Sequence, residues 1–405
     1  MILAASRHKR RLDTAIVAEM TGHTFPKGSI PFTLPTLEGN EELYMTEALT
    51  HSRLSGDGPF TKRCHSCLEE SLGVPKALLT TSCTAALEMS ALLLDVQAGD
   101  EVIVPSFTFV SSINAYVLRG ATPVFADIRP DTLNIDESRL ELLITPRTKA
   151  IIVVHYAGVA CEMDEIMTIA NRRGIVVVED NAHGLFARYR GRYLGTFGPL
   201  ATLSFHETKN FTCGEGGALL INDPSLTERA EIIREKGTDR SRFFRGQVDK
   251  YTWVDIGSSY LPSDLLAAML LGQLEARDHI QSTRQRIWDF YRANLEDWAE
   301  EQDVRLPIVP SHSEQAYHMF YLLMPNLAER QRLIAHLKER QIQAAFHYQP
   351  LHLSGMGRQL GGNEGDCPVT ERVADTLLRL PFFNRLGDED LERVVDAVRE
   401  FRVES

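Results

Sequence analysis

The stretch AIIVVHYAGVACEMDEIMTIANRRGIVVVEDNAH, residues 150–183, contains the alternation that decides the fold. Two runs rich in β-branched apolar residues, 150–158 and 174–180, flank a segment with the apolar spacing of a helix. Each run is almost continuously apolar, which is typical of strands that helices cover on both faces. The stretch therefore predicts a strand–helix–strand unit with parallel strands. Polar residues, among them Asp180 and His183, follow the second strand directly.

Similar apolar runs lie on either side of this stretch. They span residues 101–105, 122–127, 201–205 and 217–223. Helical stretches such as TAALEMSALLLDV lie between several of them. The sequence therefore predicts a doubly wound α/β domain, which we expect to span residues 30–261.

The sequence changes character after about Pro262. Residues 262–298 predict one long helical region, which begins near a proline as helices often do. A strand, a helix, a strand and two more helices are expected after it. We therefore expect a smaller α+β domain over residues 262–405, and residues 1–29 form an N-terminal extension without an assigned function.

Composition narrows the class of function. The 405 residues carry a formal net charge of −12, which argues against a nucleic-acid surface because phosphate binding needs clustered Lys and Arg. No run approaches the ~18 apolar residues of a membrane span, so we expect a cytoplasmic protein with no membrane partner. Cys64 and Cys67 form a CxxC pair, but no second pair completes a zinc site, and we expect a structural helix and no metal.

Four polar or aromatic groups lie at the ends of the predicted strands, where ligands bind in open α/β sheets. They are the helix-opening cluster Thr81–Thr84, the pair Asp180 and His183, the pair Ser204 and Lys209 before GEGG, and one aromatic, Phe107 or Phe109. Taken singly, each has a plain structural explanation: a helix cap, a solvated acid, a solvated lysine and a core aromatic.

Taken together, the four groups fit pyridoxal 5'-phosphate (PLP). A lysine amine binds the PLP aldehyde covalently, and a carboxylate keeps the pyridine nitrogen protonated so that the ring accepts electrons. The start of a helix holds a phosphate, and an aromatic side chain stacks on the ring. The sequence therefore predicts PLP as cofactor, with Lys209 as nucleophile and proton carrier. That role requires burial to lower the pKa of Lys209.

The order of the motifs TSCTAAL, PSFTFVSSINA, VVVEDNAH, SFHETKNFTCGEGG and HYQPLH resembles the DegT/DnrJ/EryC1/StrS sugar aminotransferases. The resemblance runs from Ile30 to the C-terminus. It implies the fold of PLP-dependent transferases of fold type I, with a mixed, mainly parallel sheet in the large domain. It also implies a homodimer with active sites shared between the subunits.

The resemblance also implies roles for individual residues. Lys209 matches the lysine that binds PLP, Asp180 the partner of the pyridine nitrogen, and His183 a residue near the ring hydroxyl. The other matches are phosphate contacts at Cys83, Thr84 and Ser204, ring stacking by Phe109 rather than Phe107, and substrate-site positions at His318, His347, Tyr348 and His352. One departure is Ser259, which stands where the family often has an Asn that reaches the phosphate of the neighbouring subunit, so this contact is open.

Residues 234–261 most resemble one branch, the dTDP-4-amino-4,6-dideoxygalactose transaminases. That likeness implies transfer of an amino group from L-glutamate to the 4-keto carbon of dTDP-4-keto-6-deoxy-D-glucose, in polysaccharide biosynthesis. Other nucleotide sugars, including UDP-linked ones, and other positions stay open. A PLP-dependent sugar dehydratase is a further alternative, but histidine replaces the lysine in the 3-dehydratase branch. A binding protein without cofactor is the alternative of a different class, and the joint presence of Lys209, Asp180 and Ser204 argues against it.

Overall fold

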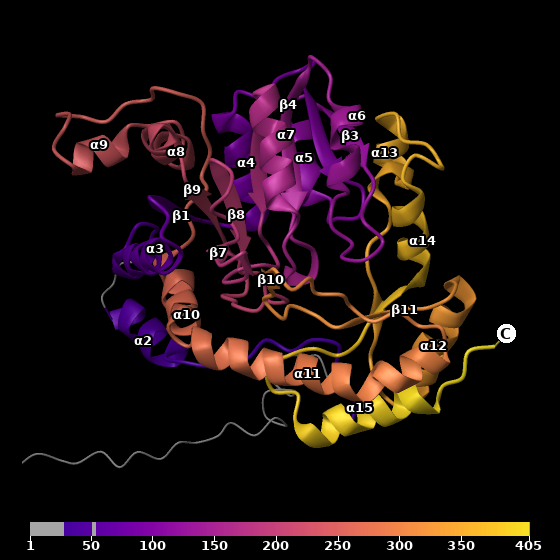
Figure 1. The fold of residues 1–405 in the computed structure, drawn as a ribbon. Helices are drawn as coiled ribbons and strands as arrows, with labels where there is room; N and C mark the ends of the chain where they lie inside the picture. Colours follow the sequence, from indigo (N-terminus) through magenta and orange to yellow (C-terminus); the bar gives the residue numbers. More distant parts are fainter. Residues whose placement is uncertain (1–27, 51–53, 405) are drawn as a thin grey trace, which may run out of the picture.

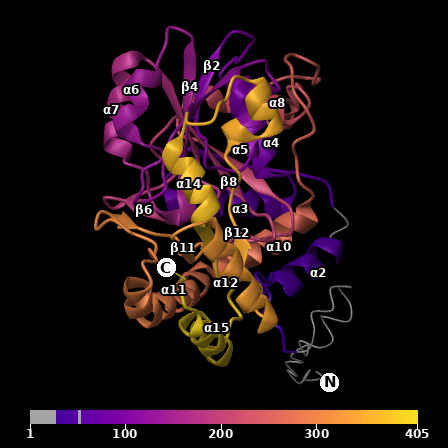
Figure 2. The ribbon, with the colours of Figure 1, turned by 90° about the vertical axis from the view of Figure 1, so that its right-hand side faces the viewer.

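The computed structural model describes residues 28–50 and 54–404. The N-terminal extension predicted for residues 1–29 lies almost wholly outside the described residues. Figure 1 shows a large sheet with its helices in the upper part and the long helix α11 (Arg277–Glu301) along the base, next to α15 (Asp388–Glu400). Figure 2, turned by 90°, shows α14 (Pro368–Thr376) between these two parts.

The large sheet has seven strands in the order β1-β9-β8-β5-β4-β2-β3. They are β1 Lys76–Thr80, β2 Glu101–Pro105, β3 Thr122–Ala126, β4 Thr148–Val154, β5 Val176–Asp180, β8 Leu200–Ser204 and β9 Gly217–Ile221. Strand β9 runs antiparallel to both its neighbours, and the other neighbouring pairs are parallel. The predicted mixed, mainly parallel sheet is confirmed, with β1 as a strand that the sequence reading did not include.

Helices cover both faces of this sheet, as the continuously apolar strands predict. One face packs against α4 Cys83–Leu93, α5 Ser111–Val117 and α8 Thr227–Arg234. The other face packs against α6 Leu140–Leu143 and α7 Met163–Arg173 at one end, and against α2 Glu41–Thr50, α3 Pro59–Leu72 and α10 Asp264–Glu275 at the other. Neighbouring strand residues show the alternation: Val102 and Val104 face α4 and α5, and Ile103 faces α7.

The smaller part of the molecule has a three-stranded antiparallel sheet in the order β11-β13-β12. Its elements are β11 Tyr321–Leu323, α12 Leu327–Glu339, β12 Ala345–Phe346, α14, β13 Leu377–Arg379 and α15. Two expectations need correction here. The single helix over residues 262–298 is interrupted at Ala276, between α10 and α11. The first of the two C-terminal helices, expected around VTERVADTLLRL at residues 369–380, ends at Thr376 because the next three residues pair with β11 and β12.

Short elements complete the chain. They are β6 Arg188–Tyr189, β7 Arg192–Tyr193, β10 Ser313–Glu314, α9 Arg240–Phe244 and α13 Gly355–Gln359, with 3₁₀ turns at Glu137–Arg139, Tyr156–Gly158, Pro224–Leu226 and Leu351–Leu353. Strands β10, β6 and β7 form a small sheet of their own.

Two segments pack in a different part of the molecule from the one predicted for them. Helix α10 is buried against α2 and α3 beside the large sheet. Ile30 instead joins the core of the smaller part, where its amide donates to the carbonyl of Gln341. The domain limits at residues 30 and 262 therefore stay a prediction. A further apolar cluster, with Phe107 and Tyr156 from the sheet and Leu377 from β13, joins the two parts.

The CxxC segment lies in α3, as predicted. Cys64 is fully buried, and its thiol lies 3.2 Å from the carbonyl oxygen of Ala267. His65 Nε2 accepts a hydrogen bond from the amide of Leu79 (2.9 Å), so both side chains have structural partners. In residues 28–50 and 54–404, no group of His, Cys, Asp and Glu is placed to hold a metal ion. Within the same ranges, no helix is long and apolar enough to span a membrane.

Candidate active site

The start of α4 lies next to the carboxyl ends of the central strands β5 and β8. Cys83, the first residue of α4, places its thiol sulfur 3.5 Å from Thr202 Oγ1 on β8. The same sulfur lies 4.0 Å from Asp180 Oδ1 at the end of β5. Three of the groups expected from strand ends are therefore adjacent in space: the helix-opening cluster, the carboxylate and the β8 end that leads to Lys209.

Asp180 is buried, with 5% of its surface exposed. Its Oδ2 accepts a hydrogen bond from Ser112 Oγ (2.7 Å) and its Oδ1 one from the amide of Ala182 (3.2 Å). Burial raises the pKa of Asp180, while the bond from Ser112 and the charge of Lys209 act in the opposite direction. The side chain is thus a carboxyl group in a fixed orientation with a cation nearby.

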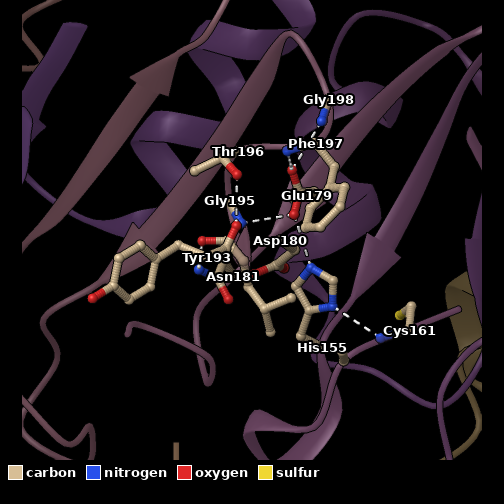
Figure 3. A network of polar contacts seen from close by, with 12 residues as sticks. His155, Cys161, Glu179, Asp180, Asn181, Tyr193, Gly195, Thr196, Phe197 and Gly198 are labelled. Carbon is tan, nitrogen blue, oxygen red and sulfur yellow. Dashed lines mark hydrogen bonds and ion pairs between the residues drawn. The ribbon is translucent and has the colours of Figure 1, made fainter. Parts of the chain in front are cut away.

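The residue before Asp180 anchors the strand from its other face. Glu179 is fully buried, and its carboxylate accepts hydrogen bonds from the amides of Gly195 (2.7 Å), Phe197 (2.6 Å) and Gly198 (2.9 Å). Its Oε2 also lies 3.0 Å from His155 Nε2 (Figure 3). Because neighbouring strand residues point to opposite faces, this network fixes the β5 end without touching the site itself.

The tautomer of His155 follows from its two partners. His155 Nδ1 accepts a hydrogen bond from the amide of Cys161 (3.2 Å), so the ring proton lies on Nε2 and is donated to Glu179. Glu179 therefore has four donors around a fully buried carboxylate. Buried carboxylates are stable when their oxygens are satisfied in this way.

Lys209 lies in the turn between β8 and β9. Burial lowers the pKa of Lys209 to about 8, with the carboxylate of Asp180 acting in the opposite direction and the guanidinium of Arg379 in the same one. Roughly a tenth of the amine is therefore unprotonated at pH 7. Lys209 also lines a small cavity of about 10 Å³ together with Thr36 and Arg284, on a side that Asp180, His183 and Cys83 do not line.

The start of α4 has the features of a phosphate site. Ser82 caps the helix by accepting a hydrogen bond from the amide of Ala85 (3.0 Å), and Thr84 Oγ1 donates to Ser111 Oγ (2.8 Å). A Cβ on Gly217 would lie 2.4 Å from the amide nitrogen of Cys83, so only glycine lets β9 pass this close. Gly217 pairs with Ser204, which brings that serine to the same end of the sheet. A helix N-terminus favours a bound anion here.

The two candidate aromatic residues differ in accessibility. Phe107 is 1% exposed and packs against Tyr156 with ring centroids 5.2 Å apart, so it belongs to the core. Phe109 is 58% exposed and lies 6.3 Å from the ring of Tyr348. Of the two, Phe109 has a free ring face for a planar ligand.

Three histidines form one wall of the site. His183 stacks on His318 with ring centroids 4.1 Å apart, and His347 lies 6.2 Å from His183. Burial lowers the pKa of all three well below the ordinary value, so the rings are neutral. Asn210, next to Lys209, accepts a 2.8 Å hydrogen bond at its Oδ1 from His318 Nδ1. The hydroxyl of Tyr156 forms a 2.9 Å hydrogen bond with His347 Nδ1.

The side chain of His183 tests whether the three histidines fit a bound ligand. Its Nδ1 is buried and has no hydrogen-bond partner within the described chain. Buried polar atoms without a partner are rare, and a bound ligand is one explanation for such an atom beside a candidate site. Together with the carboxyl of Asp180, the lysine and the helix start, the unpaired nitrogen fits PLP, which offers a ring nitrogen, a hydroxyl, an aldehyde and a phosphate.

Two predicted site residues lie elsewhere. Both ring nitrogens of His352 have protein partners, Ser106 Oγ (2.6 Å) and Glu371 Oε1 (3.0 Å), so this histidine links β2 to α14. Ser259 is exposed and lines a separate cavity of about 270 Å³ with Lys236 and other residues. The chain therefore does not bring Ser259 to its own Lys209 cluster.

Four further residues belong to the site or its support and were missed: Tyr156, Ser112, Glu179 and Arg379. Tyr156 lies two residues after the end of β4, but the predicted strand runs to residue 158 and therefore contains it. Ser112 lies beside the predicted aromatic in PSFTFVSS. Arg379 gave no such signal, because it reaches the site through the pairing of β13 with β11 and β12.

Fold and site together define a class, the α/β aminotransferases with a partly buried lysine and a buried carboxylate at the ends of central strands. The chain belongs to the DegT/DnrJ/EryC1/StrS aminotransferase family, whose profile matches residues 35–399. Aminotransferases of this family depend on PLP, so the cofactor predicted from the sequence is the family's own.

Individual relatives agree with this membership. The chain is 32% identical to the spore coat polysaccharide biosynthesis protein SpsC of Bacillus subtilis, over 92% of this chain and 96% of the relative. It is 32% identical to the GDP-perosamine synthase of Escherichia coli O157:H7, over 92% and 98%. The solved PLP form of Spr1654 from Streptococcus pneumoniae superimposes with a TM-score of 0.85 at 28% identity, covering 92% of this chain and 98% of that one.

Proposed function

We propose that this protein moves an amino group from L-glutamate to the 4-keto carbon of a nucleotide-linked sugar. The preferred substrate is dTDP-4-keto-6-deoxy-D-glucose, with dTDP-4-amino-4,6-dideoxy-D-galactose as product. The observation that supports the proposal most is the pair of Lys209 and Asp180. Each modifies the pKa of the other. Asp180 is buried and Lys209 is partly buried at the carboxyl ends of the central strands, next to the capped start of α4.

Each residue of the cluster has a role in this proposal. PLP, when bound, supplies an electron sink for the carbon that loses or gains a proton. Lys209 would hold the cofactor at its amine and serve as the base and acid that moves the proton, which suits an amine with a pKa of about 8. Asp180 would pair with the ring nitrogen, and the unpaired Nδ1 of His183 would form a hydrogen bond with the ring hydroxyl.

The remaining cofactor contacts follow the geometry of the strand ends. Cys83, Thr84 and Ser204 lie around the start of α4 and would hold the phosphate. Phe109 would stack on the ring with its exposed face. His318, His347 and Tyr348 form a chain of neighbouring rings with His183 and are the proposed substrate contacts, whereas both ring nitrogens of His352 already have protein partners.

A second candidate substrate comes from the relatives. A protein 32% identical over almost its full length is a GDP-perosamine synthase, and its name specifies a GDP-linked sugar. Residues 234–261 instead resemble the dTDP-4-amino-4,6-dideoxygalactose transaminases, and this resemblance favours a dTDP-linked sugar. A protein distinguishes sugar hydroxyls and nucleobases by a few hydrogen bonds. The dTDP-linked and GDP-linked substrates would therefore differ in their binding contacts, and the transfer of the amino group would follow the same mechanism.

The test is a panel of dTDP-, GDP- and UDP-linked keto sugars, each incubated with the PLP-loaded enzyme and L-glutamate. We expect 2-oxoglutarate release to be fastest with dTDP-4-keto-6-deoxy-D-glucose, and NMR of the product to show an axial 4-amino group. Turnover confined to GDP sugars would move the assignment to the second candidate. Release of water from the sugar without 2-oxoglutarate would favour a dehydratase instead.

We further propose a homodimer with shared active sites, in the cytoplasm. Exposed aromatic residues gather on α9 and the loop after it, where Phe244 is 67% and Trp253 77% exposed. The cavity of Ser259 lies beside them. A second copy of the chain that covered this surface would receive Ser259 near its own phosphate site. The cytoplasmic location rests on the absence of long apolar runs in the sequence and on its scattered cysteines.

A further inference from the structure

Ser112, in the first turn of α5, holds the carboxylate that we assign to the ring nitrogen of PLP. Its Oγ donates to Asp180 Oδ2 over 2.7 Å, and the amide of Ala182 donates to Oδ1 over 3.2 Å. Ser112 is 1% exposed and Asp180 5%, so little water competes for these bonds. Each oxygen of the carboxylate therefore has a protein donor, and the two bonds fix the orientation of the side chain.

A second hydroxyl supports this bond. Thr108 Oγ1 lies 2.9 Å from Ser112 Oγ, and Thr108 is also buried. A hydroxyl has one proton to donate, and Ser112 donates its proton to Asp180. Thr108 therefore donates to Ser112, and the two hydroxyls form a chain that ends on the carboxylate. Hydrogen bonds in such a chain strengthen one another in a buried site.

The neighbour of Ser112 supports a different end of the site. Ser111 Oγ accepts a hydrogen bond from Thr84 Oγ1 (2.8 Å), at the start of α4 where the phosphate would bind. The first residue of α5 therefore contacts the proposed phosphate end, and the second contacts the proposed ring-nitrogen end. A change at Ser112 can thus alter the carboxylate while the bond between Thr84 and Ser111 stays in place.

The bond from Ser112 decides how strongly the carboxylate attracts a proton. A donor stabilises the charged form of a carboxylate, so its loss raises the affinity for a proton. Burial raises the pKa of Asp180, and the bond from Ser112 acts in the opposite direction. A proton shared between Asp180 and the ring nitrogen would therefore stay on the nitrogen while Ser112 donates, and would move towards the carboxylate without this donor. PLP accepts electrons best when its ring nitrogen carries the proton.

We propose that Ser112, supported by Thr108, is a positioning residue that keeps the shared proton on the ring nitrogen of PLP. This inference rests on the pairing of Asp180 with that nitrogen in the proposed function. Ser112 acts through Asp180, so its loss should change where the proton lies and leave the cofactor attached at Lys209. A serine that only filled space would change the stability of the fold and not the position of this proton.

Solid-state ¹⁵N NMR of the enzyme loaded with ring-¹⁵N-labelled PLP reports where the proton lies, because protonation changes the chemical shift of the nitrogen. We expect the protonated position for wild type and a shift towards the unprotonated position for Ser112→Ala. Thr108→Val removes the donor to Ser112 and should shift the signal in the same direction by less. Ser112→Thr keeps the hydroxyl and should retain the wild-type position.

The half-reaction with L-glutamate, followed by cofactor absorbance, gives a second readout. In Ser112→Ala the rate at saturation should fall about 10- to 100-fold, as for the loss of a hydrogen bond to a charged group. The half-saturating L-glutamate concentration should stay within about twofold, because Ser112 contacts the carboxylate and not the amino donor. Ser112→Thr should recover most of the rate.

Thr61→Ala is the matched control. Thr61 is a fully buried hydroxyl on α3 that donates to the buried carboxylate of Asp264 over 2.8 Å, so the bond has the same chemistry as that of Ser112. Its loss should lower the free energy of unfolding, as the loss of Ser112 does. The ¹⁵N signal and the rate with L-glutamate should remain those of wild type.

A protonated ¹⁵N signal in both Ser112→Ala and Thr108→Val would overturn the inference, as would an equal shift in Thr61→Ala or an unprotonated nitrogen in wild type. If Ser112→Ala does not retain PLP, the comparison of Thr108→Val with Ser112→Thr decides the question in the same way. A wild type with the expected signals that passes no amino group from L-glutamate to any sugar would overturn the proposed function and leave the role of Ser112 intact.

Discussion

At the scale of single residues, the site pairs ionisable groups of opposite charge, and burial disfavours the charged form of each. Lys209 has a lowered pKa and Asp180 a raised one, and each reduces the shift of the other. Perturbed groups of opposite sign at a strand end are typical of catalytic sites. Both residues were predicted from their place after strands. Tyr156 was not predicted because the expected strand runs to residue 158, whereas β4 ends at Val154. Arg379 was not predicted because only tertiary pairing brings it there.

The first prediction concerns the titration of Lys209 in cofactor-free protein. Its amine should titrate near pH 8 and not near the ordinary value of a lysine. Asp180→Asn removes an anion that stabilises the ammonium, so the pKa should fall further. Arg379→Gln removes a cation that destabilises it, so the pKa should rise. Reductive ¹³C-methylation followed by NMR measures this, with Lys209→Arg to assign the signal. A shift of the opposite sign in either variant would refute the electrostatic account.

A second prediction at this scale concerns Glu179. In Glu179→Gln, an amide group replaces an oxygen that accepts from backbone amides, so two donors face each other in a fully buried place. We expect a loss of about 2–4 kcal/mol in the free energy of unfolding. Chemical denaturation measures it. Glu141→Gln, which removes an exposed ion pair with Arg173, is the control and should cost less than about 1 kcal/mol. Equal effects of the two changes would contradict the role of the buried network.

At the scale of elements, six of the seven strands of the large sheet could be predicted, but the partners of the strands could not. The apolar runs at residues 101–105 and 122–127 correspond to β2 and β3, because strands covered on both faces have an unmistakable composition. Strand β13 lies in a segment, VTERVADTLLRL, with the spacing of a helix, and it forms because residues 321–323 and 345–346 offer backbone partners. The sequence of this segment alone does not show which other segments will pair with it, so neither β13 nor the position of Arg379 could be predicted.

The contact between β9 and α4 yields the third prediction. A side chain at Gly217 would meet the backbone of Ser82 and Cys83, which has no room to move without shifting the helix start. Gly217→Ala should therefore lower the free energy of unfolding by about 1–3 kcal/mol and weaken PLP binding. Gly355→Ala is the matched control, since nothing lies within 4 Å of the added atom. Denaturant titrations and fluorescence titration with PLP measure both effects. An unaltered Gly217→Ala protein would show that the close approach has no function.

At the scale of the whole molecule, the site lies where the two parts of the chain meet. The large sheet contributes Asp180 and Lys209, and the smaller part contributes His318, His347 and Arg379. The apolar cluster with Phe107 and Leu377 holds these surfaces together. Ser259 is the exception, because its cavity lies on the outer surface. A second subunit would resolve this exception by receiving Ser259 at its own site.

Subunit mixing tests that arrangement. Lys209→Ala and Ser259→Trp proteins should each be nearly inactive alone, the second because a bulky ring would block the partner's phosphate site. After joint unfolding and refolding in equal amounts, half of the dimers are mixed and contain one intact site. About a quarter of the wild-type activity should therefore return. Size-exclusion chromatography with light scattering checks that Ser259→Trp still forms a dimer. Absence of recovery from proven mixed dimers would contradict shared sites.

The central claim is that Lys209 holds PLP and carries the reaction. The most direct measurement is borohydride reduction of the PLP-incubated protein, followed by mass spectrometry of its peptides. The account predicts one pyridoxyl group, on the peptide of residues 204–223 at Lys209, and none on folded Lys209→Ala protein. A wild-type protein that stays colourless and unmodified, or that carries the label on another lysine, would contradict it.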